Sequence, residues 1–573
     1  MTRSALTAYK RDQVIVELPF TQVIHFMNTI IANKAVLIYP EFDNQNTFWS
    51  YGYSLSRYMP SSEFGLPKRL LPPLGLMGLY RFLKPYYHSI QLIDKNIDPR
   101  PLDQLIEDAN HIFIGGMSAQ QNNLLELAKI SKQMGKIVIL GGTAVTPDSK
   151  LNLFADHLVE NEAESIMDTL MLNLRLGKTH QYYRGTPGPA EDFFQPDYSS
   201  IKLDNYIHMA VQISRGCPEK CEFCDIPSRF GKAFRVTPWE KTAHSFRQLK
   251  QLGWNGQVFI VDDNFIGHPK KTLLVLKNLY KIGEEIGYHH PKYTELTLRL
   301  ADNTEIMAKL RHWFRKAHFI NGFYGVESPN TASLLETQKK QNLRGNTSLL
   351  DKLRFISEQT GSGVMMGMIY GFDHDDQETV QKFIDFINAS HAPIVMAGLL
   401  NALPHTPLIT RLKKQQRYIQ PSSGNNSDAV INFIPNHLSV QQAELNYLQI
   451  VEAIYQPAAY FKRVLRHLQL IDPTLQSQYR NRQGQLKYLY RILSGKNARF
   501  FWRYLPQALM IAHHKSNKDR RIFTTILAEY FSLCAQFTHF SSQVKAQHLA
   551  ISTRHYHTQQ KQSWQQMQRR SSR

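Results

Sequence analysis

The feature that most constrains the fold is a series of six short apolar runs, each followed by enough chain for one helix. The runs are expected strands, at residues 208–214, 257–263, 295–300, 321–327, 363–371 and 394–400. Runs this short and this apolar are typical of parallel strands buried on both faces. Parallel neighbours need a crossover connection, and the spacing leaves room for one helix each time. We therefore predict an α/β protein containing a partial barrel of six βα units.

A shorter alternating series precedes this one. Apolar runs at 34–40, 88–94, 111–116 and 136–142 are expected strands, and residues 119–134 have helical periodicity. Two of the runs end in glycine pairs, Gly115-Gly116 and Gly141-Gly142. Ligands of open α/β sheets bind at the carboxyl ends of strands, where glycine lets backbone come close. A tight turn is the simpler explanation of either pair taken alone.

The chain has 573 residues, more than one hydrophobic core accommodates, so several domains are expected. Residues 401–430 are expected to form a loop, and the chain from 438 onward has mainly helical periodicity. The boundaries that we predict are an α/β domain at 30–185, a proline-rich linker at 186–202, the barrel at 203–425, a helical basic domain at 426–545 and a polar, disordered tail at 546–573.

Composition excludes several classes of protein. Hydrophobic residues make up 42% and charged residues 20%, as in globular proteins. No apolar run reaches the ~18 residues of a transmembrane helix, and the first residues lack the pattern of a secretory signal. Four cysteines are too few for a disulfide framework, and three of them fall within eight positions. This clustering indicates a metal site in a cytoplasmic protein.

The three clustered cysteines are Cys217, Cys221 and Cys224, in the segment CPEKCEFC directly after the first barrel strand. A structural zinc site normally has four ligands, and His208 on the preceding strand is the available fourth. Iron–sulfur clusters also take cysteine ligands in compact runs. The spacing, the aromatic Phe223 and the position after a strand favour the cluster over zinc.

This loop resembles the C-x3-C-x-aromatic-C motif of the radical S-adenosylmethionine (SAM) superfamily. The resemblance implies a [4Fe–4S] cluster on the three cysteines, with SAM on the fourth iron. Reductive cleavage of SAM would give a 5′-deoxyadenosyl radical that removes a hydrogen atom from a small-molecule substrate. It also implies an electron donor such as flavodoxin or ferredoxin, and a protein that shields the radical.

Polar residues and glycines at the strand ends are the candidate SAM contacts that the resemblance implies. They are Phe223, Asp262, Asp263, Asn264, Arg299, Glu327, Gly367 and Gly371. A helix N-cap explains Asp262 to Asn264 equally well, and ordinary ion pairs explain Arg299 and Glu327. No residue is assigned as catalytic.

Segments before and after the barrel resemble the B12-binding subgroup that includes hopanoid C-2 methylases and bacteriochlorophyll methyltransferases. The segments PPLGLMGLYRFLK, GGMSAQQ, GGTAVTP, VENEAES, LLNALPHTPL and EAIYQPAAYFKR carry the resemblance, which covers residues 34–495. It implies a Rossmann-like cobalamin-binding domain before the barrel and a helical extension of unknown function after it. Ser118, Gly141 and Gly142 would then line the cobalamin tail.

Two departures bear on cobalamin. The D-x-H-x-x-G motif, whose histidine ligates cobalt from below, is absent, as in many radical SAM relatives that leave this face open. Asn161 stands where relatives place glycine in the G-E-x-E segment. A degenerate domain without cobalamin is therefore the alternative to a cobalamin-binding one.

The C-terminal hundred residues carry 17 Lys and Arg against two Asp and Glu, so most of the net charge of +20 lies there. Basic and aromatic residues alternate through 485–514, a pattern that suits an internally packed helical domain, an anionic membrane surface or nucleic acid. We expect a peripheral position on the inner face of the membrane before nucleic-acid binding, because the resembling enzymes act on lipid-like substrates. Cys534 lies alone among apolar residues and is expected to be buried.

The combined expectation is a cobalamin-dependent radical SAM enzyme that methylates an unactivated carbon of a lipid-like or tetrapyrrole-like substrate. The alternatives are a non-methylating radical SAM rearrangement or ring-forming enzyme with a vestigial cobalamin domain, and a nucleic-acid-modifying protein. The sequence does not identify the substrate.

Overall fold

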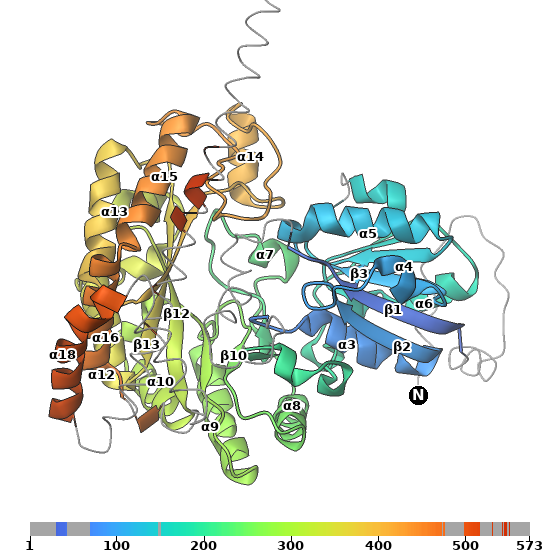
Figure 1. The fold of residues 1–573 in the computed structure, drawn as a ribbon, viewed down its shortest axis with the longest axis horizontal. Coiled ribbons are helices and arrows are strands. Elements are labelled where there is room, and N and C mark those ends of the chain that lie inside the picture. Colours follow the sequence, from blue (N-terminus) through green and yellow to red (C-terminus); the bar gives the residue numbers. More distant parts are fainter. Residues whose placement is uncertain are drawn as a thin grey trace, which may run out of the picture.

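The computed structural model describes residues 30–42, 69–146, 150–472, 474–475 and 498–515, with isolated positions between 530 and 549. The expectations for the first residues, for most of the basic segment between 476 and 529, and for the tail after 549 lie outside this range. Cys534 is buried, as expected. Two α/β units lie side by side, the N-terminal one in blue to cyan and the barrel in green to orange (Figure 1).

The N-terminal unit is a six-stranded parallel sheet of order β2-β1-β3-β4-β5-β6. Its strands are β1 (Ala32–Tyr39), β2 (Tyr87–Asp94), β3 (His111–Gly115), β4 (Ile137–Gly141), β5 (His157–Glu160) and β6 (Gln181–Arg184). Its helices are α3 (Leu74–Leu83), α4 (Leu102–Ile106), α5 (Gln121–Gln133) and α6 (Met167–Arg175). The first four strands confirm the predicted ones. β5 and β6 were not predicted, because they are four residues long and lack an extended apolar run.

Alternate residues along these strands enter two separate cores. Val36, Ile112 and Val138 pack with α4 and α5 on one face. Ala35 and Phe113 pack with α3 and α6 on the other face. Both faces of the sheet are thus covered, which explains why the strands are apolar throughout rather than alternating.

The segment between the two units is packed rather than extended into solvent. Tyr198 is fully buried and donates its hydroxyl hydrogen to the carbonyl of Ala210 at 2.7 Å. Asp197 accepts hydrogen bonds from Lys84 and Gln248, which belong to different units. The linker therefore fixes one unit against the other.

The second unit is an open, six-stranded parallel sheet of order β14-β13-β12-β11-β10-β7. Its strands are β7 (Met209–Val211), β10 (Val258–Ile260), β11 (Lys292–Leu296), β12 (Phe319–Glu327), β13 (Gly363–Tyr370) and β14 (Ile394–Leu399). Its helices are α7 (Ile226–Arg229), α8 (Trp239–Gln251), α9 (Pro269–Glu285), α10 (Glu305–Lys316), α11 (Thr331–Glu336), α12 (Leu349–Thr360) and α13 (Gln377–Ala389). The sequential strand order confirms the predicted partial barrel.

Two predictions for this unit were wrong in detail. The third strand was expected at 295–300, but β11 ends at Leu296 and residues Leu298–Ala301 form a 3-10 turn. Leu298 and Leu300 are both fully buried, so the apolar pattern continues past the end of the strand. Residues 401–430 were expected to be loop, but they contain α14 (Pro407–Lys414), capped by Thr406.

The C-terminal region is helical, as predicted, with α15 (Val440–Ile454), α16 (Pro457–Leu470) and α18 (Ala498–Lys515) packed on the outside of the barrel (Figure 1). Arg463 of α16 is completely buried and donates to the carbonyl of Ala392 at 2.9 Å. In the part of the chain that the structure describes, no helix is both long enough and apolar enough to cross a membrane.

Candidate active site

The cysteine loop begins where β7 ends and is closed at its base by a two-stranded hairpin of β8 (Ser214–Arg215) and β9 (Arg235–Val236). Asp262 fixes this base, because its carboxylate accepts hydrogen bonds from the N–H of Ile213 at 2.8 Å and from the hydroxyl of Ser214 at 2.6 Å. Burial raises the pKa of Asp262 to about 7. Its predicted SAM contact is untested, and both of its oxygens are engaged in holding the loop.

Gly216 makes the turn immediately before the first cysteine. Its φ is +87°, and an added Cβ would lie 2.3 Å from the carbonyl oxygen of Ala233. Only glycine tolerates both the left-handed backbone and this close approach. The loop entry is therefore fixed by local sterics as well as by Asp262.

The three cysteines lie in a poorly hydrated environment with hydrogen-bond donors beside them. Burial raises the pKa of the thiols of Cys217, Cys221 and Cys224. Asn264 Nδ2 lies 3.6 Å from Cys217 Sγ, and Gln341 Nε2 lies 3.4 Å from Cys221 Sγ. Thiols of this kind lose their protons when iron binds. Three thiolates with N–H donors to their sulfurs fit an iron–sulfur cluster that has one iron open to another ligand.

The geometry does not favour the zinc alternative. His208 precedes β7 and is hydrogen-bonded through Nδ1 to the hydroxyl of Tyr293 at 2.7 Å, whereas the cysteine loop follows the same strand. Among the residues that the structure describes, no three His, Cys, Asp or Glu side chains converge to hold a single metal ion, the three loop cysteines included.

A buried ion pair lies beside the cysteines. Lys339 Nζ is 2.6 Å from Glu327 Oε1, and both side chains are 9% exposed. Although burial lowers it, the pKa of Lys339 is raised overall by Glu327 and Cys221. Glu327, which ends β12, has a φ of +68°. Neither Lys339 nor Gln341 was among the predicted site residues. Both lie in the segment KKQN (residues 339–342), which also resembles the corresponding segment of the B12-binding subgroup.

Two more buried carboxyl groups lie near neighbouring strand ends, and Glu295 interacts with both members of this pair. Burial, with the charges of Asp263 and Glu327, raises the pKa of Glu295 to about 8. Burial and the charge of Asp225 raise the pKa of Asp263 to about 6. These side chains concentrate titratable groups at the carboxyl edge of the sheet, where barrel enzymes bind their ligands.

The other predicted SAM contacts surround the same edge. Arg299 lies in the 3-10 turn after β11, and its Nη1 is 3.5 Å from Glu219 Oε1 in the cysteine loop. Phe223 packs against Phe372, with ring centroids 5.8 Å apart. Gly367 pairs with Gly325 across β12 and β13, and Gly371 has a φ of +105°. Their roles toward SAM remain predictions.

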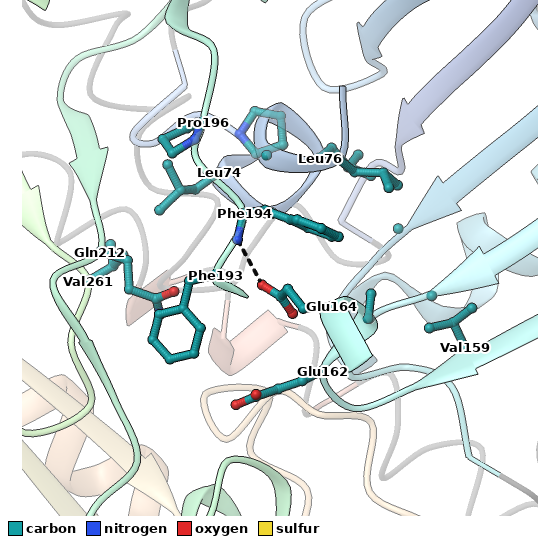
Figure 2. A pocket seen from close by; sticks show the side chains of 18 of the residues that line it. Leu74, Leu76, Val159, Glu162, Glu164, Phe193, Phe194, Pro196, Gln212 and Val261 are labelled. Carbon is teal, nitrogen blue, oxygen red and sulfur yellow. Dashed lines mark hydrogen bonds between the residues drawn. The ribbon is translucent and has the colours of Figure 1, made fainter. Parts of the chain in front are cut away.

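A cavity of about 550 Å³ lies between the two units (Figure 2). Strand ends and turns of the N-terminal unit form one wall, and the other wall includes Phe193, Gln212 and Val261. Gly141 and Gly142 line it, and Gly142 has a φ of +94°. A Cβ on Gly142 would lie 2.3 Å from the carbonyl oxygen of Gly116. This glycine cradle fits a cofactor whose chain enters between strand ends.

Ser118 lies behind the turn that carries Gly142 and Thr143, and its predicted place along the cofactor tail stays a prediction. It is not among the side chains that line the cavity, and its hydroxyl donates to the carbonyl of Thr143 at 3.2 Å. Gly424, from the segment after β14, covers it so closely that an added Cβ would lie 2.4 Å from Ser118 Cβ. Ser118 thus supports the turn at Thr143 and joins the two units.

The backbone conformation at Asn161 explains why asparagine can stand at the glycine position of the G-E-x-E segment. Its φ is +65°, a left-handed conformation that glycine adopts freely and asparagine tolerates better than most residues. It also lines the cavity. The substitution therefore keeps the backbone that a cofactor-binding turn needs at this position.

Charged pairs join the two units next to the cavity. Glu162 pairs with Arg235, and Glu164 Oε1 lies 2.9 Å from Arg215 Nη1. Glu164 also accepts a hydrogen bond from the N–H of Phe194 at 3.2 Å (Figure 2). Both arginines belong to the hairpin at the base of the cysteine loop and stack on Phe193. The cysteine loop is thus tied directly to the glycine-lined unit.

A Rossmann-like unit with a glycine cradle, joined to an open parallel barrel that carries a three-cysteine loop, defines a radical SAM enzyme with a cobalamin-binding-type domain. The comparisons with known proteins name the family. The chain belongs to the B12-binding radical SAM methyltransferases.

Sequence relatives carry this assignment. The chain is 32% identical to an uncharacterized methyltransferase of Synechocystis sp., over 92% of this chain and 96% of the relative. It is 30% identical to the hopanoid C-2 methylase of Rhodopseudomonas palustris, over 69% and 73%. It is 23% identical to the bacteriochlorophyllide d C-12(1)-methyltransferase of Chlorobaculum tepidum, over 68% and 84%. Residues 406–552 match a family described as a domain of unknown function.

Solved structures share the fold. The cobalamin-dependent SAM radical enzyme OxsB with aqua-cobalamin bound has a TM-score of 0.56 at 14% identity, covering 92% of this chain and 82% of that one. TsrM from Kitasatospora setae, with cobalamin and a [4Fe-4S] cluster bound, has a TM-score of 0.55 at 11% identity, covering 90% and 100%.

Proposed function

We propose that this protein is a C-methyltransferase that binds a [4Fe–4S] cluster, SAM and cobalamin and methylates an unactivated carbon of a lipid-like substrate. When bound, the cluster and SAM supply a radical that removes a hydrogen atom, and cobalamin supplies the methyl group. The observation that carries the proposal is the cavity of about 550 Å³ that the glycine cradle shares with the base of the cysteine loop. The lipid-like class is supported by the hopanoid C-2 methylase among the relatives, and a tetrapyrrole by the bacteriochlorophyllide enzymes.

Different residues of the chain would bind the cluster, SAM and cobalamin. Cys217, Cys221 and Cys224 would hold the cluster, while Asn264 and Gln341 donate to two of the sulfurs. Arg299 carries the fixed positive charge suited to the carboxylate of SAM. Gly141, Gly142 and Asn161 would accommodate cobalamin. The apolar side chains of Leu74, Leu76, Val159, Phe193 and Phe194 would keep water out of the shared cavity (Figure 2).

Anaerobic reconstitution with iron, sulfide and cobalamin, followed by metal analysis and absorption spectra, tests the cofactors. We expect about four irons and one cobalamin per chain. Replacing the three loop cysteines by alanine should abolish iron binding, whereas Cys534→Ala, at a buried position in the C-terminal region, should retain it. Iron without cobalamin would eliminate the methyl donor from the proposal, and no iron would eliminate the radical chemistry.

Product analysis separates methylation from the alternatives. Extracts of lipids and of tetrapyrroles should be incubated with the reconstituted enzyme, SAM and a reduced flavodoxin or ferredoxin. Formation of S-adenosylhomocysteine together with a product heavier by one methyl group supports methylation. Formation of 5′-deoxyadenosine alone supports a rearrangement or ring-forming reaction with a vestigial cobalamin domain.

A peripheral membrane position is the second part of the proposal, and α18 favours it. Trp502, Leu509 and Met510 are 55%, 43% and 59% exposed on this helix, and Arg499 and Arg503 are also exposed. Aromatic and aliphatic side chains beside cations suit an anionic headgroup surface.

Sedimentation with vesicles tests the membrane position. The protein should bind vesicles that contain phosphatidylglycerol and not those of pure phosphatidylcholine, and the triple variant with serine at Trp502, Leu509 and Met510 should lose binding. Leu153→Ser removes a side chain that is 77% exposed on the N-terminal unit and should have no effect. Salt-sensitive binding to RNA without binding to vesicles would support the nucleic-acid alternative instead.

A further inference from the structure

A group of charged side chains ties the cysteine loop to α14, the first helix of the C-terminal region when that region is taken as residues 406–552, the segment that matches the domain of unknown function. Glu222 lies in the loop directly after Cys221, and Arg411 lies on α14. Arg411 donates from Nε and Nη2 to the two carboxylate oxygens of Glu222, at 2.7 and 3.0 Å. The two side chains are only 28% and 14% exposed. This two-pronged geometry fixes the orientation of the carboxylate as well as its distance.

The same guanidinium group holds two further carboxylates. Arg411 Nη2 lies 2.9 Å from Glu336 Oε1, and Nη1 donates to Asp373. Arg417 donates to Asp373 as well. Carboxylates from the cysteine loop, from the end of α11 and from the turn after β13 therefore converge on one cation. Because like charges this close repel, their convergence depends on the arginines, of which Arg411 contacts all three carboxylates and Arg417 contacts Asp373.

The backbone of Glu222 is held from both sides. Its N–H donates to the carbonyl of Thr337 at 2.9 Å, and its carbonyl accepts from the N–H of Leu408 at 3.1 Å. Leu408 lies in the first turn of α14, where N–H groups have no acceptor within the helix. The start of the C-terminal region thus supplies both a side chain and a backbone donor to a residue next to a cluster ligand.

We infer that Arg411 is a positioning residue, through which the C-terminal region holds the cysteine loop in the shape that receives the iron–sulfur cluster. This gives a role to the beginning of the region that matches a domain of unknown function. The inference rests on the proposed function, since it requires that the loop bind a cluster. Arg411 acts through Glu222 and the loop backbone rather than on a sulfur atom.

The test compares the full-length reconstituted protein with Arg411→Met, Arg411→Lys and Glu222→Gln. We expect Arg411→Met to release iron to a chelator about tenfold faster than the wild type, as outer-shell substitutions do in other metal sites. The electron paramagnetic resonance spectrum of its reduced cluster should also shift. Arg411→Lys keeps the positive charge but cannot make the two parallel hydrogen bonds to Glu222, so its rate of iron release should lie between those of the wild type and Arg411→Met. Arg247→Met removes a similar bidentate pair, with Glu285 on the outer surface of α8 and α9, and should match the wild type.

The double variant Glu222→Gln/Arg411→Met should release iron no faster than the worse single variant, because both substitutions break one interaction. If Arg411→Met does not fold, Glu222→Gln gives the same test from the loop side. Wild-type iron release and an unchanged spectrum in a folded Arg411→Met or Glu222→Gln protein would overturn the inference. Failure of the wild type to hold iron would instead overturn the proposed function.

Discussion

Individual donors to the cysteine sulfurs are expected to control how readily a cluster bound there accepts an electron. Gln341 is such a donor, with its Nε2 3.4 Å from Cys221 Sγ. Hydrogen bonds to sulfur stabilise the more negative, reduced cluster and so raise its reduction potential. Gln341→Leu should therefore keep its iron but show a more negative midpoint in a redox titration followed by electron paramagnetic resonance. Gln381→Leu, at an exposed position on α13, is the matched control, and an unchanged potential in Gln341→Leu would contradict the prediction.

His208 makes the fold sensitive to acid. Desolvation lowers the pKa of its imidazole from 6.5 to about 4. Between these values the unfolded chain binds more protons than the folded one, so stability falls as the pH is lowered from 6.5 to 4. The contribution lost is about 3 kcal/mol. His208→Asn keeps a hydrogen-bond partner for Tyr293 but does not titrate. Denaturant unfolding at pH 7 and pH 4.5 should show that this variant loses less free energy of unfolding on acidification than the wild type. His88→Asn, at an exposed site, should lose as much as the wild type.

At the scale of elements, the cradle depends on two strand-end turns that touch through backbone. Gly142→Ala would place a methyl group 2.3 Å from Gly116 O in a left-handed residue, and it should lower the free energy of unfolding by about 3 kcal/mol. Cobalamin binding, measured by absorbance after gel filtration, should be lost. Gly135→Ala has a similar φ of +72° with open space around it, so it should cost about 1 kcal/mol and leave cobalamin binding intact. If Gly142→Ala and Gly135→Ala changed stability and cobalamin binding equally, the close approach of Gly142 to Gly116 would not be needed for either.

The sequence patterns located the elements better than the contacts between them. Apolar runs predicted all six barrel strands, and the one displaced strand arose because burial continues through the 3-10 turn at Leu298 and Leu300. Glycine pairs and clustered cysteines pointed to a wall of the cavity and to the buried loop at which we propose cofactors. Gln341 and Arg411 could not be predicted, because they meet the cysteine loop from 120 and 189 residues away. No local periodicity encodes such a contact.

For the whole molecule, the pairing of Glu162 with Arg235 is one of the buried contacts that join the two units. Glu162→Gln keeps the shape of the side chain but removes its charge from a site where it is 2% exposed. Stability should fall by about 2 kcal/mol. Hydrogen exchange should accelerate in residues 186–200 and in the hairpin of β8 and β9. The surface variant Glu285→Gln breaks a solvated pair with Arg247 and should change neither quantity. Protection that stays unchanged in Glu162→Gln would mean that the other contacts between the units, such as the Glu164–Arg215 pair, hold them together without this charge.

The cavity between the units also dictates an order of biosynthesis. Its walls come from residues as far apart as Leu71 and Val261, and Gly424 covers the turn beside it. The N-terminal sheet can fold while the ribosome is still making the barrel, because domains generally fold as units in order of synthesis. Its cradle then faces solvent without an opposite wall. A cofactor held between the units is therefore loaded late, into a nearly finished chain, and a protein truncated within the barrel would fold its first sheet without retaining that cofactor.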